Sequence, residues 1–271
     1  MNSYFSDFLT QPEIETQFLP PQNMKVAIII DTYRQLSSLN PLLQDICRLK
    51  LYQTKIDIYI VNNGSDHSNQ ANLAKFCFAH LQIITPDKQA DEFGGFYYGL
   101  QFVSHLQYDY IWLLNDDLRL DPLALSILIT TLQNHHEVGF VSSQLYQKKE
   151  PNTIQEFGNL INSQASYSCN YKMSINDDSI NRKPYVKVEF CVVKSILLRH
   201  RVVQELGIFK DDFPHCDDID LCLRVKQAGW VIAVNSNSII WEKSPDLKLS
   251  QSLDSYNECD LYYWQKHKPD F

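Results

Sequence analysis

The chain has 271 residues, of which 44% are hydrophobic, and its formal net charge is −8. An acidic chain without a basic stripe is a poor candidate for binding nucleic acid, although a small anionic ligand needs only local positive charge or a metal ion. The longest apolar runs are as long as strands and fall well short of the ~18 residues that would cross a bilayer.

Seven cysteines, with no CxxC pair among them, indicate reduced thiols in a cytoplasmic protein. The first residues, MNSYFSDFLTQPE, have neither the basic start nor the apolar segment of a signal peptide. Residues 1–23 are polar and aromatic, so we expect them to form an N-terminal arm. We therefore predict a cytoplasmic protein whose folded domain follows this arm.

Strand-like and helix-like segments alternate between residues 25 and 145. Apolar runs predict five strands, at residues 25–30, 56–61, 81–85, 110–114 and 139–145. Helices are expected between them, around residues 39–50 and 70–80, after residue 96 up to about 105, and from residue 121 onward. This alternation is typical of the α/β class, with a mostly parallel, doubly wound sheet and helices on both faces.

Polar clusters follow three of these strands directly, at residues 31–34 (DTYR), 62–66 (NNGSD) and 115–117 (NDD). Ligands of open α/β sheets bind beyond the carboxyl ends of the strands. We therefore expect the three clusters to converge on one edge of the sheet.

The second half of the chain has a different pattern. Residues 150–185 are polar and predict loops with short strands. Further strands are expected at residues 186–193, 230–234 and 238–241, and helices at 199–206, 218–228 and 252–267. Gly229 is expected to end the second of these helices, and the pair Asp220 and Arg224, four residues apart, is expected to be structural.

Asp116 and Asp117 carry the first candidate chemistry. Adjacent carboxylates after a buried strand suit Mg²⁺ or Mn²⁺, which would hold a diphosphate and offset its charge as it departs. The alternative is that one of them caps the helix near Asp121 or lines a solvated turn. Their position directly after a predicted strand favours the metal site.

Asp217 and Asp218 carry the second. They lie at a predicted helix start, where either could be a plain N-cap, but a carboxylate there could also take the proton from an acceptor hydroxyl. His215, just before them, could contact an acceptor or be an ordinary loop residue. Arg34 could contact phosphate or base, or lie on the surface.

Six segments occur in a characteristic order: AIIIDTYRQ, IYIVNNGSD, FGGFYYGL, YIWLLNDDLRLDP, VEFCVVKSILLRHRVVQELGIFKDDF and HCDDIDLCLRVKQAGW. Together they resemble the inverting glycosyltransferases of family two, which have the GT-A fold, over roughly residues 24–245. The resemblance implies a nucleotide-sugar-binding half at residues 24–145, a smaller mixed acceptor-binding half at 146–245, and a C-terminal helix within 246–271.

The resemblance also implies residue roles. The nucleotide base and ribose would be lined by Thr32, Arg34, Asn62 and Asn63. The donor diphosphate would lie near Gly94, Gly95 and Asp116, with Mn²⁺ or Mg²⁺ on Asp117 and Asp116. Asp218 would be the catalytic base with Asp217 beside it, and His215 and Trp241 would face the acceptor.

Three positions depart from the family pattern. Asn115 is the first residue of the metal triplet, and Asn62 stands where an acid usually reads the uracil. Glu242 stands near the usual metal-binding histidine, so either Glu242 replaces it as an oxygen ligand or fewer protein groups hold the metal. The QxxRW motif of processive synthases is absent, which favours the addition of one or a few sugars.

Within the family, GGFYYG and HCDDID are similar to the galactofuranosyl- and rhamnosyltransferase-like branch, although Cys216 replaces an aromatic residue. That branch builds bacterial surface polysaccharides: O-antigen of lipopolysaccharide, capsule and galactan. The implied donor is a UDP-sugar, with a dTDP-sugar as the alternative. The implied acceptor is a glycan or lipid-linked glycan, with peripheral contact at the inner face of the plasma membrane through the aromatic and basic residues near 262–268.

Other readings of the sequence stay open. The chain could transfer another hexose or an N-acetylhexosamine, or it could bind nucleotide sugar without catalysis, as the three departures suggest. A nucleotidyltransferase is disfavoured, because residues 31–34 lack the glycine-rich phosphate loop that would follow the first strand.

Overall fold

The computed structural model describes residues 23–33, 36–63, 73, 76, 78–86, 94–147, 154–156, 159–162, 167–170, 185–191, 193–207 and 217–242. Its strands are β1 (Lys25–Thr32), β2 (Lys55–Asn62), β3 (Leu81–Ile84), β4 (Tyr110–Asn115), β5 (Leu118–Leu120), β6 (Val138–Gln147), β7 (Ile154–Glu156), β8 (Asn159–Asn162), β9 (Tyr167–Asn170), β10 (Val186–Val188), β11 (Ser195–Arg199) and β12 (Val231–Glu242). Its helices are the 3₁₀ helix η2 (Leu36–Leu39), α2 (Asn40–Ile46), α3 (Gly94–Val103), α4 (Ala124–Asn134), α6 (His200–Leu206) and α7 (Asp217–Gln227).

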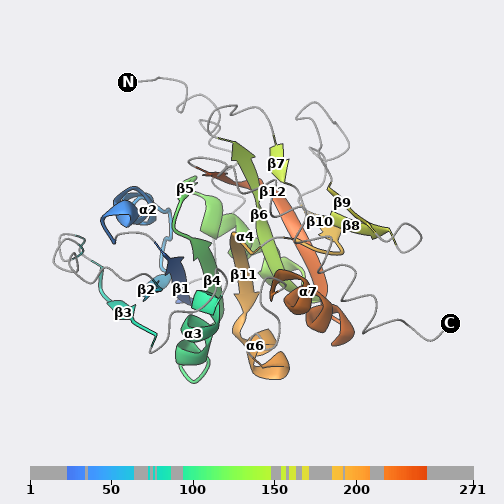
Figure 1. The fold of residues 1–271 in the computed structure, drawn as a ribbon, viewed down its shortest axis with the longest axis horizontal. Coiled ribbons are helices and arrows are strands. Elements are labelled where there is room, and N and C mark those ends of the chain that lie inside the picture. Colours follow the sequence, from blue (N-terminus) through green and yellow to red (C-terminus); the bar gives the residue numbers. More distant parts are fainter. Residues whose placement is uncertain are drawn as a thin grey trace.

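One mixed sheet of ten strands forms the centre of the molecule (Figure 1). Its main path runs β10-β12-β6-β11-β4-β1-β2-β3, with β5 beside β12 and β7 beside β6. The strands β4, β1, β2 and β3 are parallel, and β12 runs parallel to β6. The longest pairings are therefore parallel, which confirms the predicted α/β class.

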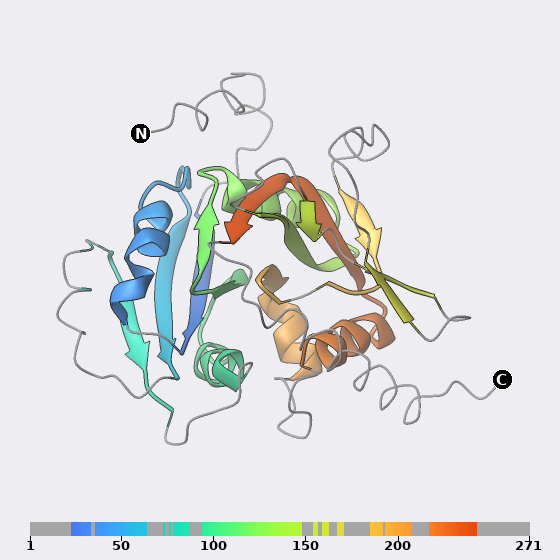
Figure 2. The same ribbon diagram turned by 45° about the horizontal axis from the view of Figure 1, so that its top comes forward.

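Helices cover both faces of this sheet (Figure 2). Along β1, alternate side chains face opposite layers: Ala27 and Ile29 pack with α3, α6 and α7, whereas Ile28 and Ile30 pack with α2 and α4. Strands covered on both sides need apolar residues at every position, which explains the continuous apolar runs. The doubly wound arrangement is as predicted.

The predicted boundary between residues 145 and 146 falls inside β6. Strands β10, β11 and β12, all from the second half of the chain, join the same sheet, and β11 lies antiparallel between β4 and β6. The two predicted halves therefore share one sheet, and β11 links them.

Several element predictions are wrong in detail. β11 was not predicted: residues 194–198 fall between the strand predicted at 186–193 and the helix predicted at 199–206 and were assigned to neither. The strand predicted at residues 186–193 ends at Val188. Residues 78–80, inside the predicted helix 70–80, are not helical. By contrast, Gly229 has a positive φ of 85° beyond α7, as its predicted role requires.

Strand β12 is continuous where two strands were predicted. Its pairing with β6 shifts between Asn235 and Ile239, so residues 236–238 form a bulge. Polar contacts hold this bulge against α4: the Asn235 amide donates to the Thr131 hydroxyl at 2.7 Å, and the Ser238 hydroxyl donates to the Ala124 carbonyl at 3.0 Å. The polar residues that broke the strand pattern in the sequence are the ones that hold the bulge.

The N-terminal arm and the C-terminal helix lie outside the described residues, as do the aromatic and basic residues near 262–268. Within the described ranges, no helix combines the length and apolar character that crossing a membrane would need. Cys47 is exposed, whereas Cys191 and Cys222 are buried.

Candidate functional site

The polar ends of β1, β2 and β4 meet at one edge of the sheet, as expected. Thr32 pairs with Asn62 across β1 and β2, and Asp31 pairs with Asn115 across β1 and β4. The amide N–H of Asn63 donates to the carbonyl oxygen of Thr32 at 2.9 Å. Parallel register therefore brings together residues that are about 30 and 80 positions apart in the chain.

Asp116 and Asp117 form the turn between β4 and β5, which we call the acidic turn (residues 115–117). The hydroxyl of Thr32 donates to the Asp116 carboxylate, with Oγ1 and Oδ2 2.6 Å apart. Thr32 is only 1% exposed. Its side chain therefore holds a carboxylate in place, a contact that the sequence-based role at the nucleotide did not anticipate.

Asp31 lies against the first turn of α3. A Cβ atom at Gly95 would collide with the carboxylate of Asp31, so only glycine permits this approach. The amino end of a helix stabilises a negative charge. Gly95 therefore allows close packing against the carboxylate of Asp31, and Gly94 begins the same helix. The approach of these two glycines to the donor diphosphate stays a prediction.

Glu242 reaches the acidic turn from β12. It pairs with Leu118 of β5, the residue that follows Asp117. Its Oε1 lies 2.8 Å from the Nζ of Lys194, which donates to it. On the other side of the turn, the amide N–H of Asn115 donates to the carbonyl oxygen of Lys194 at 3.0 Å. A lysine and a third acid therefore adjoin Asp116 and Asp117.

The carboxylates of Asp116 and Asp117 are hard oxygen donors that fit Mg²⁺ or Mn²⁺. Among the residues that the structure describes, no three His, Cys, Asp or Glu side chains gather as a metal-binding group. Glu242 is engaged by Lys194, so its expected role as a third ligand stays a prediction.

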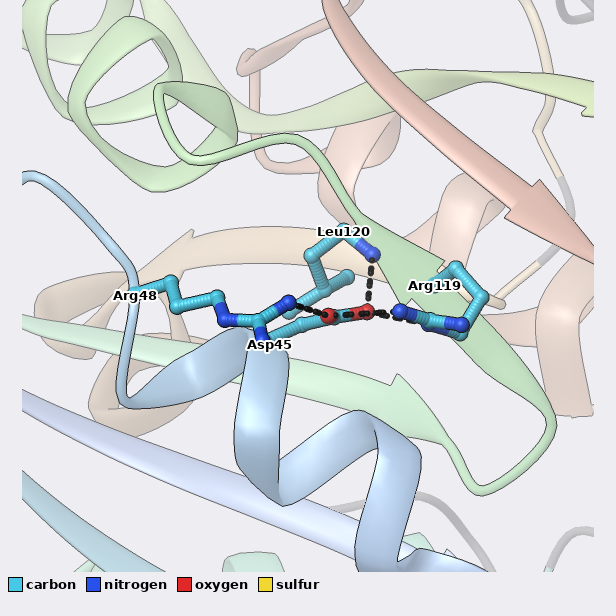
Figure 3. A network of polar contacts seen from close by, with 4 residues as sticks. All are labelled: Asp45, Arg48, Arg119 and Leu120. Carbon is cyan, nitrogen blue, oxygen red and sulfur yellow. Dashed lines mark hydrogen bonds and ion pairs between the residues drawn. The ribbon is translucent and has the colours of Figure 1, made fainter. Parts of the chain in front are cut away.

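A second ion pair supports the strand after the acidic turn (Figure 3). Arg119 of β5 donates to Asp45 of α2 through Nε at 2.5 Å and through its terminal nitrogen at 2.9 Å, and the amide of Leu120 donates to the same carboxylate at 3.2 Å. The hydrogen bond that Arg119 donates to Asp45 raises the pKa of Arg119. Arg48 approaches Asp45 from the exposed side at 3.9 Å.

Asp121 performs the capping that the sequence analysis considered for Asp116 or Asp117. Its Oδ1 accepts the amide N–H of Leu123 at 2.8 Å, directly before α4. Burial raises the pKa of this carboxyl to about 6. Because Asp121 supplies this cap, the acidic turn is not needed for it.

The second acidic segment opens α7. Asp217 and Asp218 lie in its first turn. Asp220 and Arg224 form the predicted structural pair, with Oδ2 and Nε 2.7 Å apart, and Leu221 and Cys222 are buried against the sheet. This packing fixes the helix axis, while the side chains of Asp217 and Asp218, and all of Arg34 and His215, lie outside what the structure describes.

The remaining predicted contacts are placed as follows. Asn62 and Asn63 are 1% and 2% exposed at the end of β2. Trp241 is partly buried on β12 and pairs with Arg119 of β5. Both asparagines therefore lie at the shared edge, and Trp241 adjoins it through β5.

The sequence placed Asp31 in the polar cluster 31–34 without giving it a role of its own, and Lys194 was not singled out. Each had a local signal: Asp31 is a charge at the end of a buried strand, and Lys194 is the one cation in the run FCVVKSILL. Neither signal identified a partner, because the partners lie tens of residues away.

Two solved structures share this fold. The crystal structure of GalNAc-T7 with UDP, GalNAc and Mn²⁺ has a TM-score of 0.66 at 8% identity, covering 90% of this chain and 50% of that one. The mannosyltransferase PcManGT from Pyrobaculum calidifontis, in complex with GDP-Man and Mn²⁺, has a TM-score of 0.58 at 11% identity, covering 87% and 64%. The chain thus spans half of the first and under two thirds of the second.

Among curated proteins, no sequence matches this chain. The family described as glycosyl transferase family 2 matches residues 27–207, which is more than half of the chain. The mixed sheet with helices on both faces is the GT-A arrangement shared with both solved structures. The chain therefore belongs to glycosyl transferase family 2.

Proposed function

We propose that this chain is a metal-dependent, inverting glycosyltransferase that moves a sugar from a nucleotide diphosphate donor to a hydroxyl of a glycan. The observation that carries the proposal is the acidic turn. It lies at the carboxyl ends of parallel strands, beside Thr32 and Asn62, in a chain of this family. Open α/β sheets bind nucleotides at this place.

Asp116 and Asp117 would hold Mn²⁺ or Mg²⁺, with Asp117 the more direct ligand. A bound divalent ion would offset the charge of the departing nucleoside diphosphate. The hydrogen bond from Thr32 fixes one carboxylate in advance, so little reorganisation is needed when the donor binds. Asn62, Asn63 and Arg34 would contact the base and ribose.

Asp218 would take the proton from the acceptor hydroxyl as that oxygen attacks the anomeric carbon. A single displacement of this kind inverts the configuration at that carbon. The amino end of α7 favours the charged form of a carboxylate in its first turn, which a base requires. Asp217, His215 and Trp241 would position the acceptor.

The donor sugar is proposed from the sequence motifs. Galactofuranose or rhamnose, carried by UDP or dTDP, is favoured by the GGFYYG and HCDDID segments. The product would enter a bacterial surface polysaccharide such as O-antigen, capsule or galactan. A lipid-linked acceptor would bring the enzyme to the inner face of the plasma membrane.

A member that binds nucleotide sugar without turnover is the second candidate. Asn115 and Asn62 replace acids of the family pattern, and Lys194 engages the carboxylate of Glu242. This candidate predicts donor binding without product. The enzyme predicts product that depends on Asp218.

The test is nucleotide release from UDP-galactofuranose, UDP-galactose, UDP-glucose, UDP-N-acetylglucosamine, dTDP-rhamnose and GDP-mannose, each with and without Mn²⁺ and with glycan acceptors. We expect Mn²⁺-dependent release from one donor, and its loss in Asp218→Asn. Asp220→Asn, on the same helix but in the structural pair, is the matched control. Release that persists in Asp218→Asn would remove the base assignment, and binding without release would favour the second candidate.

A further inference from the structure

Lys194 and Glu242 adjoin the acidic turn from its two sides. Lys194 is fixed to the end of β4 by the hydrogen bond from the Asn115 amide to its carbonyl oxygen. Glu242 is fixed beside the start of β5 by its pairing with Leu118. Their charged ends meet at 2.8 Å. The ion pair therefore bridges the strands that enter and leave the turn.

Both side chains are largely buried, with 17% of Lys194 and 7% of Glu242 exposed. Removing two charges from water costs several kcal/mol for each ion, and mutual attraction often fails to offset that cost. Well-packed apolar residues would serve stability as well or better. The pair is therefore better explained by a need for charge at this edge.

The charge needed can be identified from the neighbours. Among the described residues, Asp116 and Asp117 lie in the turn itself, and Lys194 offsets the charge of Glu242 on β12. The two aspartates of the turn balance one divalent cation. Asp31, the next acid on this edge, faces the amino end of α3. The site thus already holds a fixed positive charge next to the place proposed for the metal.

We propose that Lys194 binds the diphosphate of the donor and that Glu242 positions Lys194, without being a metal ligand. This inference rests on the proposed function. An ammonium group has three N–H donors, so Lys194 can hold Glu242 and a phosphate oxygen at the same time. Its charge would stabilise the nucleoside diphosphate as that group leaves.

The test uses UDP, dTDP and GDP as probes, titrated calorimetrically into the full chain with and without Mn²⁺. The main variant is Lys194→Met/Glu242→Gln, which removes both charges of the pair together. We expect its affinity for the nucleoside diphosphate that the wild type binds to fall about tenfold or more. Lys194→Arg, which keeps the charge, should stay within about threefold of the wild type.

The control is Arg201→Met/Glu205→Gln, which removes an exposed pair on α6 whose atoms lie 2.6 Å apart. It should leave nucleotide affinity unchanged, and thermal unfolding of all variants identifies any that fail to fold. In Glu242→Gln, electron paramagnetic resonance should find Mn²⁺ binding within about threefold of the wild type.

If the double variant binds the nucleoside diphosphate as tightly as the wild type does, this inference is overturned and the proposed function is not affected. A tenfold loss of Mn²⁺ binding in Glu242→Gln would make Glu242 a metal ligand and overturn it as well. If the wild type binds none of UDP, dTDP and GDP in the presence of Mn²⁺, the proposed function fails and this inference fails with it.

Discussion

Two buried carboxylates flank β5, and the structure holds them in different ways. Asp45, on a helix that covers the sheet, accepts hydrogen bonds from two nitrogens of the Arg119 guanidinium and from the amide of Leu120. Glu242, on the sheet edge, receives the ammonium of Lys194 at one oxygen. The planar guanidinium of an arginine fixes both the distance and the angle to the carboxylate, whereas the ammonium of a lysine is a point charge on a flexible side chain. The first arrangement suits anchoring, and the second suits a charge that must meet a ligand.

The largest effect is expected in the acidic turn, which is the part of the molecule given a role in catalysis. Asp116→Asn should lower the rate of sugar transfer at least about a thousandfold, because a neutral amide is a poor ligand for a hard divalent cation. The fold should stay intact, since Asp116 is partly exposed in a turn. The rate is measured as nucleotide release at saturating Mn²⁺.

Asp109→Asn is the control for this change. Asp109 precedes the opposite end of β4, is exposed, and accepts the amide N–H of Lys25 at 2.8 Å. It should keep nearly full activity. Asp116→Asn retaining more than about a tenth of the activity would remove the acidic turn from the chemistry.

Asp45→Ala tests the anchoring side of the comparison. This change leaves Arg119 and the amide of Leu120 without the carboxylate that accepts their hydrogen bonds. We therefore expect the free energy of unfolding to fall by roughly 3–5 kcal/mol. The measurement is urea denaturation. Arg48→Met, which removes the exposed partner of Asp45 at 3.9 Å, should cost less than about 1 kcal/mol. Equal losses of unfolding free energy in the two variants would contradict the anchoring role given to the pair of Asp45 and Arg119.

Asp121 extends the comparison to a buried carboxylate held by a backbone amide. Its pKa in the folded chain is about 6, above the ordinary 3.8, so folding favours its protonated form. Its contribution to stability is therefore highest below about pH 4, falls as the pH rises to 6, and is constant above that.

Asp121→Asn should remove this dependence, because the amide keeps the cap and carries no charge. The difference in unfolding free energy between wild type and variant should change by up to about 3 kcal/mol between pH 4 and pH 7. Denaturation curves at several pH values measure it. A constant difference across this range would show that burial does not perturb Asp121.

Thr32→Val should give the smallest of these effects. Losing the hydrogen bond that orients Asp116 should lower kcat/KM about tenfold and raise the Mn²⁺ concentration needed for half-maximal rate. Thr32→Ser keeps the hydroxyl and should stay near wild type. If valine and serine behave alike, the contact at 2.6 Å does not position Asp116.

The sequence predicted the parallel part of the fold well for a physical reason. β1, β2 and β4 each contain a continuous apolar run, and these runs are buried. β11 also contains an apolar run, but that run lies between the predicted strand at 186–193 and the predicted helix at 199–206 and was assigned to neither. Strand β12 was divided because its bulge is polar.

The site was predictable in composition and location, and much less in its contacts. Residues that end parallel strands must share an edge, so Asn62 and Asp116 could be grouped from the sequence. The bonds from Thr32 to Asp116 and from Lys194 to Glu242 join residues 84 and 48 positions apart. Such pairings depend on strand order, which hydrophobic periodicity does not encode.

The bulge in β12 determines which face the end of that strand presents. Before the bulge, odd-numbered Ala233 packs on the α2 and α4 side of the sheet and even-numbered Val234 packs on the other side. After the bulge, even-numbered Ile240 packs on the α2 and α4 side, so the alternation is inverted. The inserted segment 236–238 has an odd length and therefore inverts the alternation. Removing one residue from it would turn Glu242 to the opposite face, so the number of residues in this segment matters to the site as much as their identity.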